Sequence, residues 1–145
     1  MEEIRVPIRS DADTVVARQK GRAAAVAIGL SRTDATFVAT AISEIARNIT
    51  SHAGSGEIVI RRVTQGGHDG LVVVAHDEGP GIPDVAAVLR HEYASDAGLG
   101  IGLWGAQRLM DAVEVLSEPG RGTTVTMTKW CRFDDVGTLL GQRGA

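Results

Sequence analysis

Apolar residues in the first half of the chain have the spacing of a strand followed by two helices. Residues 4–8 alternate apolar and polar side chains around Pro7, which predicts an edge strand because proline cannot donate a ladder hydrogen bond. A capping box over 10–13 then predicts the start of a helix that spans 11–28. Apolar residues at three- and four-residue spacing predict a second, amphipathic helix over 34–52.

The second half of the chain contains strand-like stretches and one clear helix. Residues 57–64 and 71–77 predict two strands joined by a Gly-rich loop over 65–70, and the continuous apolar start of the second predicts a buried central strand. The remaining predicted elements are a short helix over 84–91, a helix over 103–110 and strands over 113–116 and 123–130. This order predicts an α+β fold in which helices cover one face of a largely antiparallel mixed sheet.

Composition narrows the class of protein to one globular domain. The 145 residues are 43% hydrophobic and only 3% aromatic, which predicts a single core of Val, Ile, Leu and Ala. A net charge of −3 argues against a general nucleic-acid binder. No apolar run approaches the roughly 20 residues of a membrane span. The N-terminus lacks the pattern of a signal peptide and Cys131 is the one cysteine, so we expect a cytoplasmic protein.

Three polar residues of the second predicted helix share one side of it. Glu44, Asn48 and His52 are four residues apart, and at about 100° per residue they stay close together around the helix. They either form a polar flank beside the core or line a site. By itself, His52 is better explained as a surface residue at the end of the helix.

A carboxylate and two glycines follow the buried strand. Asp77 closes that strand and is followed by Gly79 and Gly81. The carboxylate either caps a turn or accepts a hydrogen bond from the exocyclic amine of a flat ring. In the second case the glycines allow the ring to lie against the backbone.

Two further Gly-containing segments lie near the predicted helix over 103–110 and the last strand. Gly98, Gly100 and Gly102 lead into the helix, where free N–H groups suit a phosphate, but neither a Walker ending nor a dinucleotide fingerprint is present. Gly122-Thr123-Thr124 alone would be read as a turn followed by a strand.

Together, and in this order, these four motifs resemble the N, G1 and G2 boxes and the terminal Gly-Thr motif of the GHKL ATPase/kinase superfamily. The resemblance covers residues 2–130 and implies the Bergerat fold, a two-layer α/β sandwich that binds ATP. It divides the chain into an ATP-binding kinase domain over 1–130 and a C-terminal tail over 131–145.

Within the superfamily, the stretches 43–49, 77–82, 98–103 and 108–125 resemble the RsbT-like serine/threonine kinases of the bacterial stressosome. The resemblance implies ATP-dependent phosphorylation of STAS-domain partners of the RsbS or RsbR type. It also implies activation of an RsbU-like phosphatase after release. The alternative is an anti-sigma factor of the RsbW or SpoIIAB type, which binds a sigma factor and phosphorylates its anti-anti-sigma antagonist. An ATP-binding domain cut from a histidine kinase agrees less well, because the predicted helix over 11–28 contains no histidine.

The resemblance also implies how the adenine end of ATP is bound. Asp77 would accept a hydrogen bond from the adenine amino group, and Thr123 or Thr124 would support it through a bridging water. Gly79 and Gly81 would form the wall against the ring.

The phosphate end would be bound by the two predicted helices. Asn48 would ligate Mg²⁺, and Glu44 would orient or deprotonate the attacking hydroxyl. Arg47 would form an ion pair or contact a partner, and residues 82–97 would form a lid. The phosphates would contact the backbone of Gly98, Gly100, Gly102 and Leu103.

Overall fold

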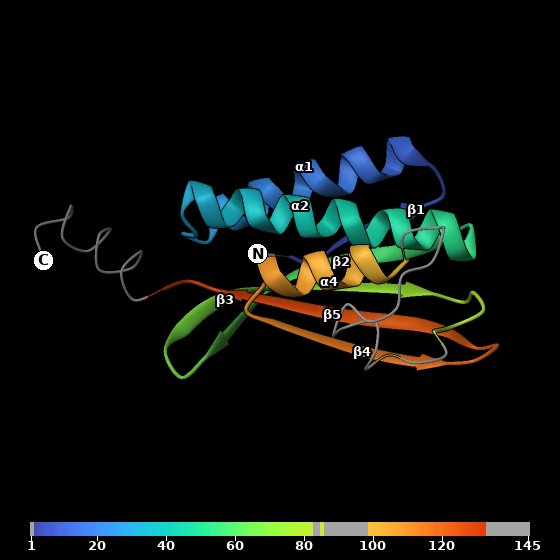
Figure 1. Cartoon of the computed structure of the whole chain (residues 1–145). Coiled ribbons are helices and arrows are strands. Elements are labelled where there is room, and N and C mark those ends of the chain that lie inside the picture. Colours follow the sequence, from blue (N-terminus) through green and yellow to red (C-terminus); the bar gives the residue numbers. More distant parts are fainter. Residues whose placement is uncertain (1, 83–84, 86–98, 133–145) are drawn as a thin grey trace, which may run out of the picture.

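The computed structural model describes residues 2–82, 85 and 99–132 of the chain. In this part, α1 (Asp11–Ala27), α2 (Arg32–Asn48) and α4 (Leu99–Leu109) lie on one face of a sheet (Figure 1). None of the described helices is long and apolar enough to cross a bilayer.

The sheet has five strands in the order β1-β2-β3-β5-β4 within the described residues. The strands are β1 (Ile4–Ile8), β2 (Gly56–Gln65), β3 (His68–Asp77), β4 (Ala112–Glu118) and β5 (Gly122–Trp130). The α+β prediction, the central place of β3 and the edge place of β1 are confirmed. Every pairing among the described strands is antiparallel, so the largely antiparallel character of the sheet is confirmed and these strands include no parallel pair that would make it mixed.

The capping box predicted before α1 does not form as expected. Ser10 is extended, and its side chain makes no capping hydrogen bond. Instead, Asp13 reaches one residue further back and accepts a hydrogen bond from the Arg9 N–H at 2.9 Å. At α2, by contrast, the Ser31 hydroxyl accepts from the Asp34 N–H at 3.1 Å, which is a regular N-cap.

The α-helical part of α2 ends at Asn48, earlier than predicted. The chain continues as a π-helical turn over Ile49–Ala53, and the Gly54 N–H closes this turn on the Ile49 carbonyl at 2.9 Å. Gly54 then stops the helix with a φ of +86°. Single π turns are often found at functional sites, because they reposition the side chains around them.

The loop between β2 and β3 is shorter than predicted. Only Gly66 and Gly67 separate the strands, and their φ values of +59° and +81° suit a tight hairpin. The strands extend because Asp69 binds across the hairpin, accepting from Arg62 at 2.7 Å and from the Thr64 hydroxyl at 2.8 Å. The hydrogen bond from Arg62 is the largest cause of a lowered pKa of Asp69.

The remaining boundaries also differ from the predicted ones. Helix α4 begins at Leu99, so Gly100 and Gly102 lie in its first turn and not before it. Strands β4 and β5 are longer than predicted. The predicted helix over 84–91, Gly98, and most of the segments 82–97 and 131–145 lie outside the described residues.

The core between the helices and the sheet is aliphatic, as the low aromatic content predicted. Its largest fully buried side chains are Ile8, Val38, Ile42, Ile45, Ile49, Ile58, Ile60, Leu71, Val73, Leu103 and Met127.

A buried lysine, which the sequence analysis did not identify, joins both helices α2 and α4 to the sheet. The Lys129 side chain on β5 is only 4% exposed. Its ammonium donates to the Leu109 carbonyl of α4 at 2.9 Å. It also lies 3.8 Å from Asp34 in α2 and 3.4 Å from Asp111 after α4. This cluster therefore fixes the start of α2 relative to the end of α4.

Removing Asp34 alone is expected to destabilise the fold more than removing Asp34 and Lys129 together. Asp34→Ala leaves the Lys129 ammonium buried with one carboxylate fewer, and we expect it to lower the free energy of unfolding by about 2–4 kcal/mol. Lys129→Met in the same background replaces the charge by an apolar side chain and should recover part of the loss. Urea unfolding of the variants measures both effects. A double variant no more stable than Asp34→Ala would contradict the coupling.

Candidate functional site

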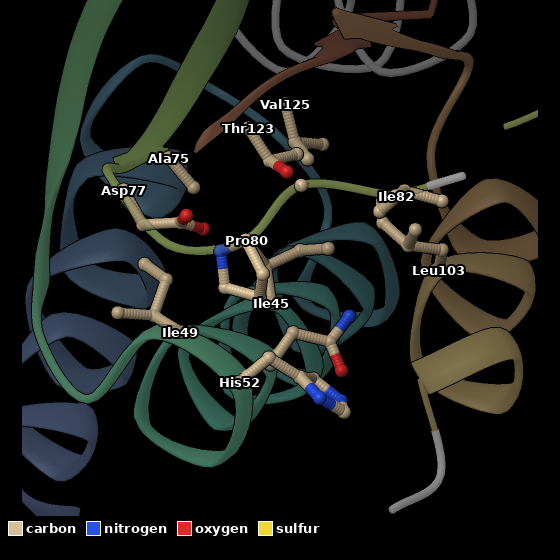
Figure 2. Close-up of a pocket in the computed structure, with 12 residues that line it drawn as sticks. Ile45, Ile49, His52, Ala75, Asp77, Pro80, Ile82, Leu103, Thr123 and Val125 are labelled. Carbon is tan, nitrogen blue, oxygen red and sulfur yellow. The ribbon is translucent and has the colours of Figure 1, made fainter. Parts of the chain in front are cut away.

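A cavity opens between the end of α2, the start of α4 and the sheet, as Figure 2 shows. With its open mouth it has a volume of about 510 Å³. Its lining residues are Ile45, Asn48, Ile49, His52, Ala75, Asp77, Pro80, Gly81, Ile82, Leu103, Thr123 and Val125. Such a mostly apolar lining with a few polar groups is typical of a small-molecule site.

The carboxylate of Asp77 caps a turn and lines the cavity at the same time. Its Oδ1 accepts a hydrogen bond from the Gly79 N–H at 2.9 Å, so the turn-capping interpretation holds. The side chain nevertheless lies among the cavity residues (Figure 2). A carboxylate has several lone pairs, so one backbone bond leaves capacity for a ligand donor.

Thr123 and Thr124, the first two threonines of β5, lie on opposite faces of the sheet. Thr123 pairs with Asp77 across the strands, is 8% exposed and lines the cavity. Its hydroxyl lies 3.0 Å from Ser117 Oγ, a residue that the sequence analysis missed. Thr124 instead contacts the ring of His76 at 2.8 Å, outside the cavity. Of the two candidates, the structure therefore brings only Thr123 to Asp77.

The glycines after Asp77 are required by contacts within the protein. A Cβ on Gly79 would lie 2.6 Å from the Cβ of Ala53. Gly81 has a φ of +83°, and a Cβ there would lie 2.5 Å from the Glu118 carbonyl oxygen. The Gly120 N–H also donates to the Pro80 carbonyl at 2.8 Å. The segment is thus held between the π-helical turn and the β4–β5 turn.

Two polar side chains of the cavity are buried without a partner among the described residues. They are the Nδ2 atom of Asn48 and the Nε2 atom of His52. His52 is therefore not the surface residue that the sequence favoured, because it is half-buried and lines the cavity. Buried polar groups are normally hydrogen-bonded, so these two orphan atoms point to a ligand.

Helix α4 comes very close to Asn48. A Cβ on Gly102 would lie 2.8 Å from Asn48 Oδ1, so only a glycine allows this approach. Leu103, the next residue, is buried and lines the cavity. The amide of Asn48 thus lies directly beside the first turn of α4, which contains Gly100.

Glu44 is not among the residues that line this cavity. It lies one turn before Asn48 and forms an ion pair with Arg47 at 4.0 Å. Its side chain lines a separate hollow between α2 and α4.

The described residues fit a magnesium ion that arrives with a phosphate ligand. They contain no cluster of three or more His, Cys, Asp or Glu side chains that could hold a metal alone. Asn48 offers one amide oxygen beside the first turn of α4. Mg²⁺ commonly takes one or two protein ligands and completes its shell with water and substrate phosphates.

Comparison with known proteins relates the chain to one family of ATPases. Residues 8–129 match the histidine kinase-like ATPase domain. The chain is 44% identical over 127 residues to the serine/threonine-protein kinase RsbT of Bacillus subtilis, which covers 88% of this chain and 96% of that protein. It is 34% identical over 97 residues to an anti-sigma F factor of Caldanaerobacter subterraneus, which covers 64% and 68% of the two.

A solved structure supports the fold alone. One chain of the SiaB–SiaC complex from Pseudomonas aeruginosa aligns with a TM-score of 0.52 and 16% identity. The alignment covers 90% of this chain and 89% of that one.

Two glycines near the cavity provide a matched pair for testing the backbone contacts. Gly120 has a φ of +80°, and an added Cβ would meet no described atom within 4 Å, so Gly120→Ala should cost only backbone strain, about 1–2 kcal/mol. Gly122 has a φ of +108°, and its added Cβ would lie 2.1 Å from the Asp77 carbonyl oxygen. We therefore expect Gly122→Ala to cost about 3–5 kcal/mol. Urea unfolding compares the two, and equal losses would mean that the contact with Asp77 is unimportant.

Proposed function

Because this chain belongs to the histidine kinase-like ATPase domains, and within them to the RsbT-like serine/threonine-protein kinases, we propose that it phosphorylates a STAS-domain partner of the RsbS or RsbR type. After release from that partner it would activate an RsbU-like phosphatase. The observation that carries the proposal is the meeting of Asp77, Thr123 and Asn48 in one cavity, where the Asn48 Nδ2 atom has no partner among the described residues.

At the adenine end, Asp77 accepts a hydrogen bond from the exocyclic amine. Thr123, its cross-strand neighbour, supports the same edge of the ring through water. Gly79 and Gly81 have no side chains, so the backbone can lie close to the ring. Packing against Ala53 and Glu118 already requires both glycines. Thr124 has no part in this arrangement, because its hydroxyl contacts His76.

At the phosphate end, the first turn of α4 and Asn48 act together. The first N–H groups of a helix have no partner within the helix, so Gly100, in the first turn of α4, presents a backbone donor to the phosphates. Gly102 allows the close approach of Asn48, and Leu103 lines the cavity beside them, whereas the predicted Gly98 lies outside the described residues. Asn48 would hold Mg²⁺ through its amide oxygen, and the ion would supply positive charge that stabilises the phosphates during transfer.

Glu44 acts on the acceptor and not on the nucleotide. The acceptor hydroxyl oxygen bonds to the γ-phosphorus while the bond from that phosphorus to the β–γ bridging oxygen breaks, which leaves ADP. Glu44 orients the hydroxyl or takes its proton, since it lies one turn from Asn48 but outside the cavity lining.

The anti-sigma factor is the second candidate, because an anti-sigma F factor matches at 34% identity. Incubation with ATP and an RsbS-type STAS protein, followed by mass-spectrometric mapping, tests the kinase proposal. A stable complex with a sigma factor and no transfer to the STAS protein would favour the second candidate.

Asp77→Asn is expected to weaken ATP binding by about 10- to 150-fold. The amide can present its NH₂ group to the adenine amine, and the lost hydrogen bond is worth about 1.5–3 kcal/mol. Asp69→Asn is the matched control, because it removes a carboxylate from the other end of the same strand. Calorimetry measures both affinities. A folded Asp77→Asn protein with unchanged affinity would remove Asp77 from the adenine site.

Glu44→Ala is expected to keep ATP affinity near normal and to slow phosphotransfer by about 10²–10⁴-fold. Arg47→Ala is the control, because it removes the ion pair and leaves the carboxylate in place. Single-turnover transfer and ATP affinity are measured on the same preparation. Transfer at the wild-type rate by Glu44→Ala would disprove the catalytic role of this residue without affecting the kinase assignment.

A further inference from the structure

The second hollow lies between two antiparallel helices. Gly102 of α4 touches Asn48 near the end of α2, while the end of α4 lies beside the earlier part of α2. Figure 1 shows the two helices side by side. We call this hollow the α2–α4 groove; it is lined by Thr40, Glu44, Trp104, Gly105, Arg108 and Leu109.

The groove has an open floor and an aromatic wall. A Cβ added to Gly105 would meet no atom of the described residues within 4 Å, so there is room beside this glycine in the part of the chain that the structure describes. Beside it, the guanidinium of Arg108 stacks 4.8 Å from the centre of the Trp104 ring. Tryptophan and arginine are the side chains that most often dominate binding at protein interfaces. Trp104 is one of only two tryptophans in the chain.

The groove is continuous with the catalytic region. Its end at Glu44 is one helical turn from Asn48, which lines the nucleotide cavity. A chain segment lying in the groove would therefore bring its residues to the place where a phosphoryl acceptor is needed.

The charges along the groove favour an acceptor that carries a carboxylate. Arg108 is exposed, and the nearby Arg47 side chain is 68% exposed, whereas Glu44 is only 27% exposed. An acidic side chain on the bound segment can pair with Arg108, while a hydroxyl lies at the Glu44 end.

We propose that the α2–α4 groove is the docking site for the hydroxyl-bearing segment of the protein acceptor. An apolar side chain of that segment covers Gly105, a carboxylate pairs with Arg108, and the serine or threonine lies next to Glu44. This inference rests on the proposed kinase function and specifies where its protein substrate binds.

Gly105→Met tests the groove without disturbing the nucleotide cavity. The new side chain fills open space and favours the helix, so α4 should remain folded. Gln107→Met is the matched control, because it adds the same side chain at an exposed position on another face of α4. With a purified RsbS-type STAS protein as acceptor, we expect Gly105→Met to raise the acceptor KM at least 10-fold. The maximal rate and the ATP affinity should stay within about twofold, and Gln107→Met should behave as wild type.

A binding measurement that needs no transfer accompanies the kinetics. The chain is labelled with 5-fluorotryptophan, and Trp130→Phe assigns the two fluorine NMR signals to Trp104 and Trp130. Addition of the unlabelled STAS protein should shift the Trp104 signal and leave that of Trp130 in place.

The outcomes separate this inference from the proposed function. Transfer by wild type with an unchanged KM in Gly105→Met would overturn the groove and leave the kinase assignment intact. A Gly105→Met protein altered only in ATP affinity would overturn the acceptor site and assign the groove to a segment of this chain that acts on the nucleotide cavity. A protein altered only in self-association, measured by light scattering, would assign the groove to a second copy of the chain. Failure of wild-type transfer would count against the proposed function, and the Trp104 signal would still decide whether the acceptor docks here.

Discussion

The geometry of the site depends on how closely α4 approaches α2. The backbone of Gly102 lies against the amide of Asn48, where a methyl group would be only 2.8 Å from the amide oxygen. At the other end of the helix pair, Lys129 ties the Leu109 carbonyl to Asp34. Two contacts, one at each end, therefore fix the register of the helices, and both the cavity and the α2–α4 groove follow from that register.

Contacts within the protein itself already require the glycines of these motifs. In the sequence, clustered glycines suggest a backbone that must approach a bound molecule. In the fold, Gly79, Gly81 and Gly122 each lie against another part of the same chain, at distances that no Cβ would tolerate. These contacts hold Asp77 and the segment after it in place at the edge of the cavity.

Sequence patterns predicted the helices, the central strand and the order of the motifs, because apolar periodicity and local spacing are properties of short segments. The π-helical turn after Asn48 depends on exact backbone geometry, so the sequence did not reveal it. Adjacent strand residues face opposite sides, but which of Thr123 and Thr124 faces the cavity depends on strand pairing and was left open. The Lys129 cluster could not be predicted, because its partners Asp34 and Leu109 are distant along the chain. The separation of Glu44 from the cavity likewise depends on where α4 lies.

The exposed edges of β1 and β4, the outer strands of the described sheet, influence whether strands of other molecules can pair with this domain. An unpaired strand edge invites another strand to join it, and proteins discourage this with short edges, proline and charge. β1 has five residues and contains Pro7, while β4, at the other edge, exposes Glu114 and Glu118. At β4 the two charges flank the 74% exposed side chain of Leu116 on the same face of the strand. They therefore act as gatekeepers, because a second strand added beside this apolar side chain would bring its own residues against two carboxylates.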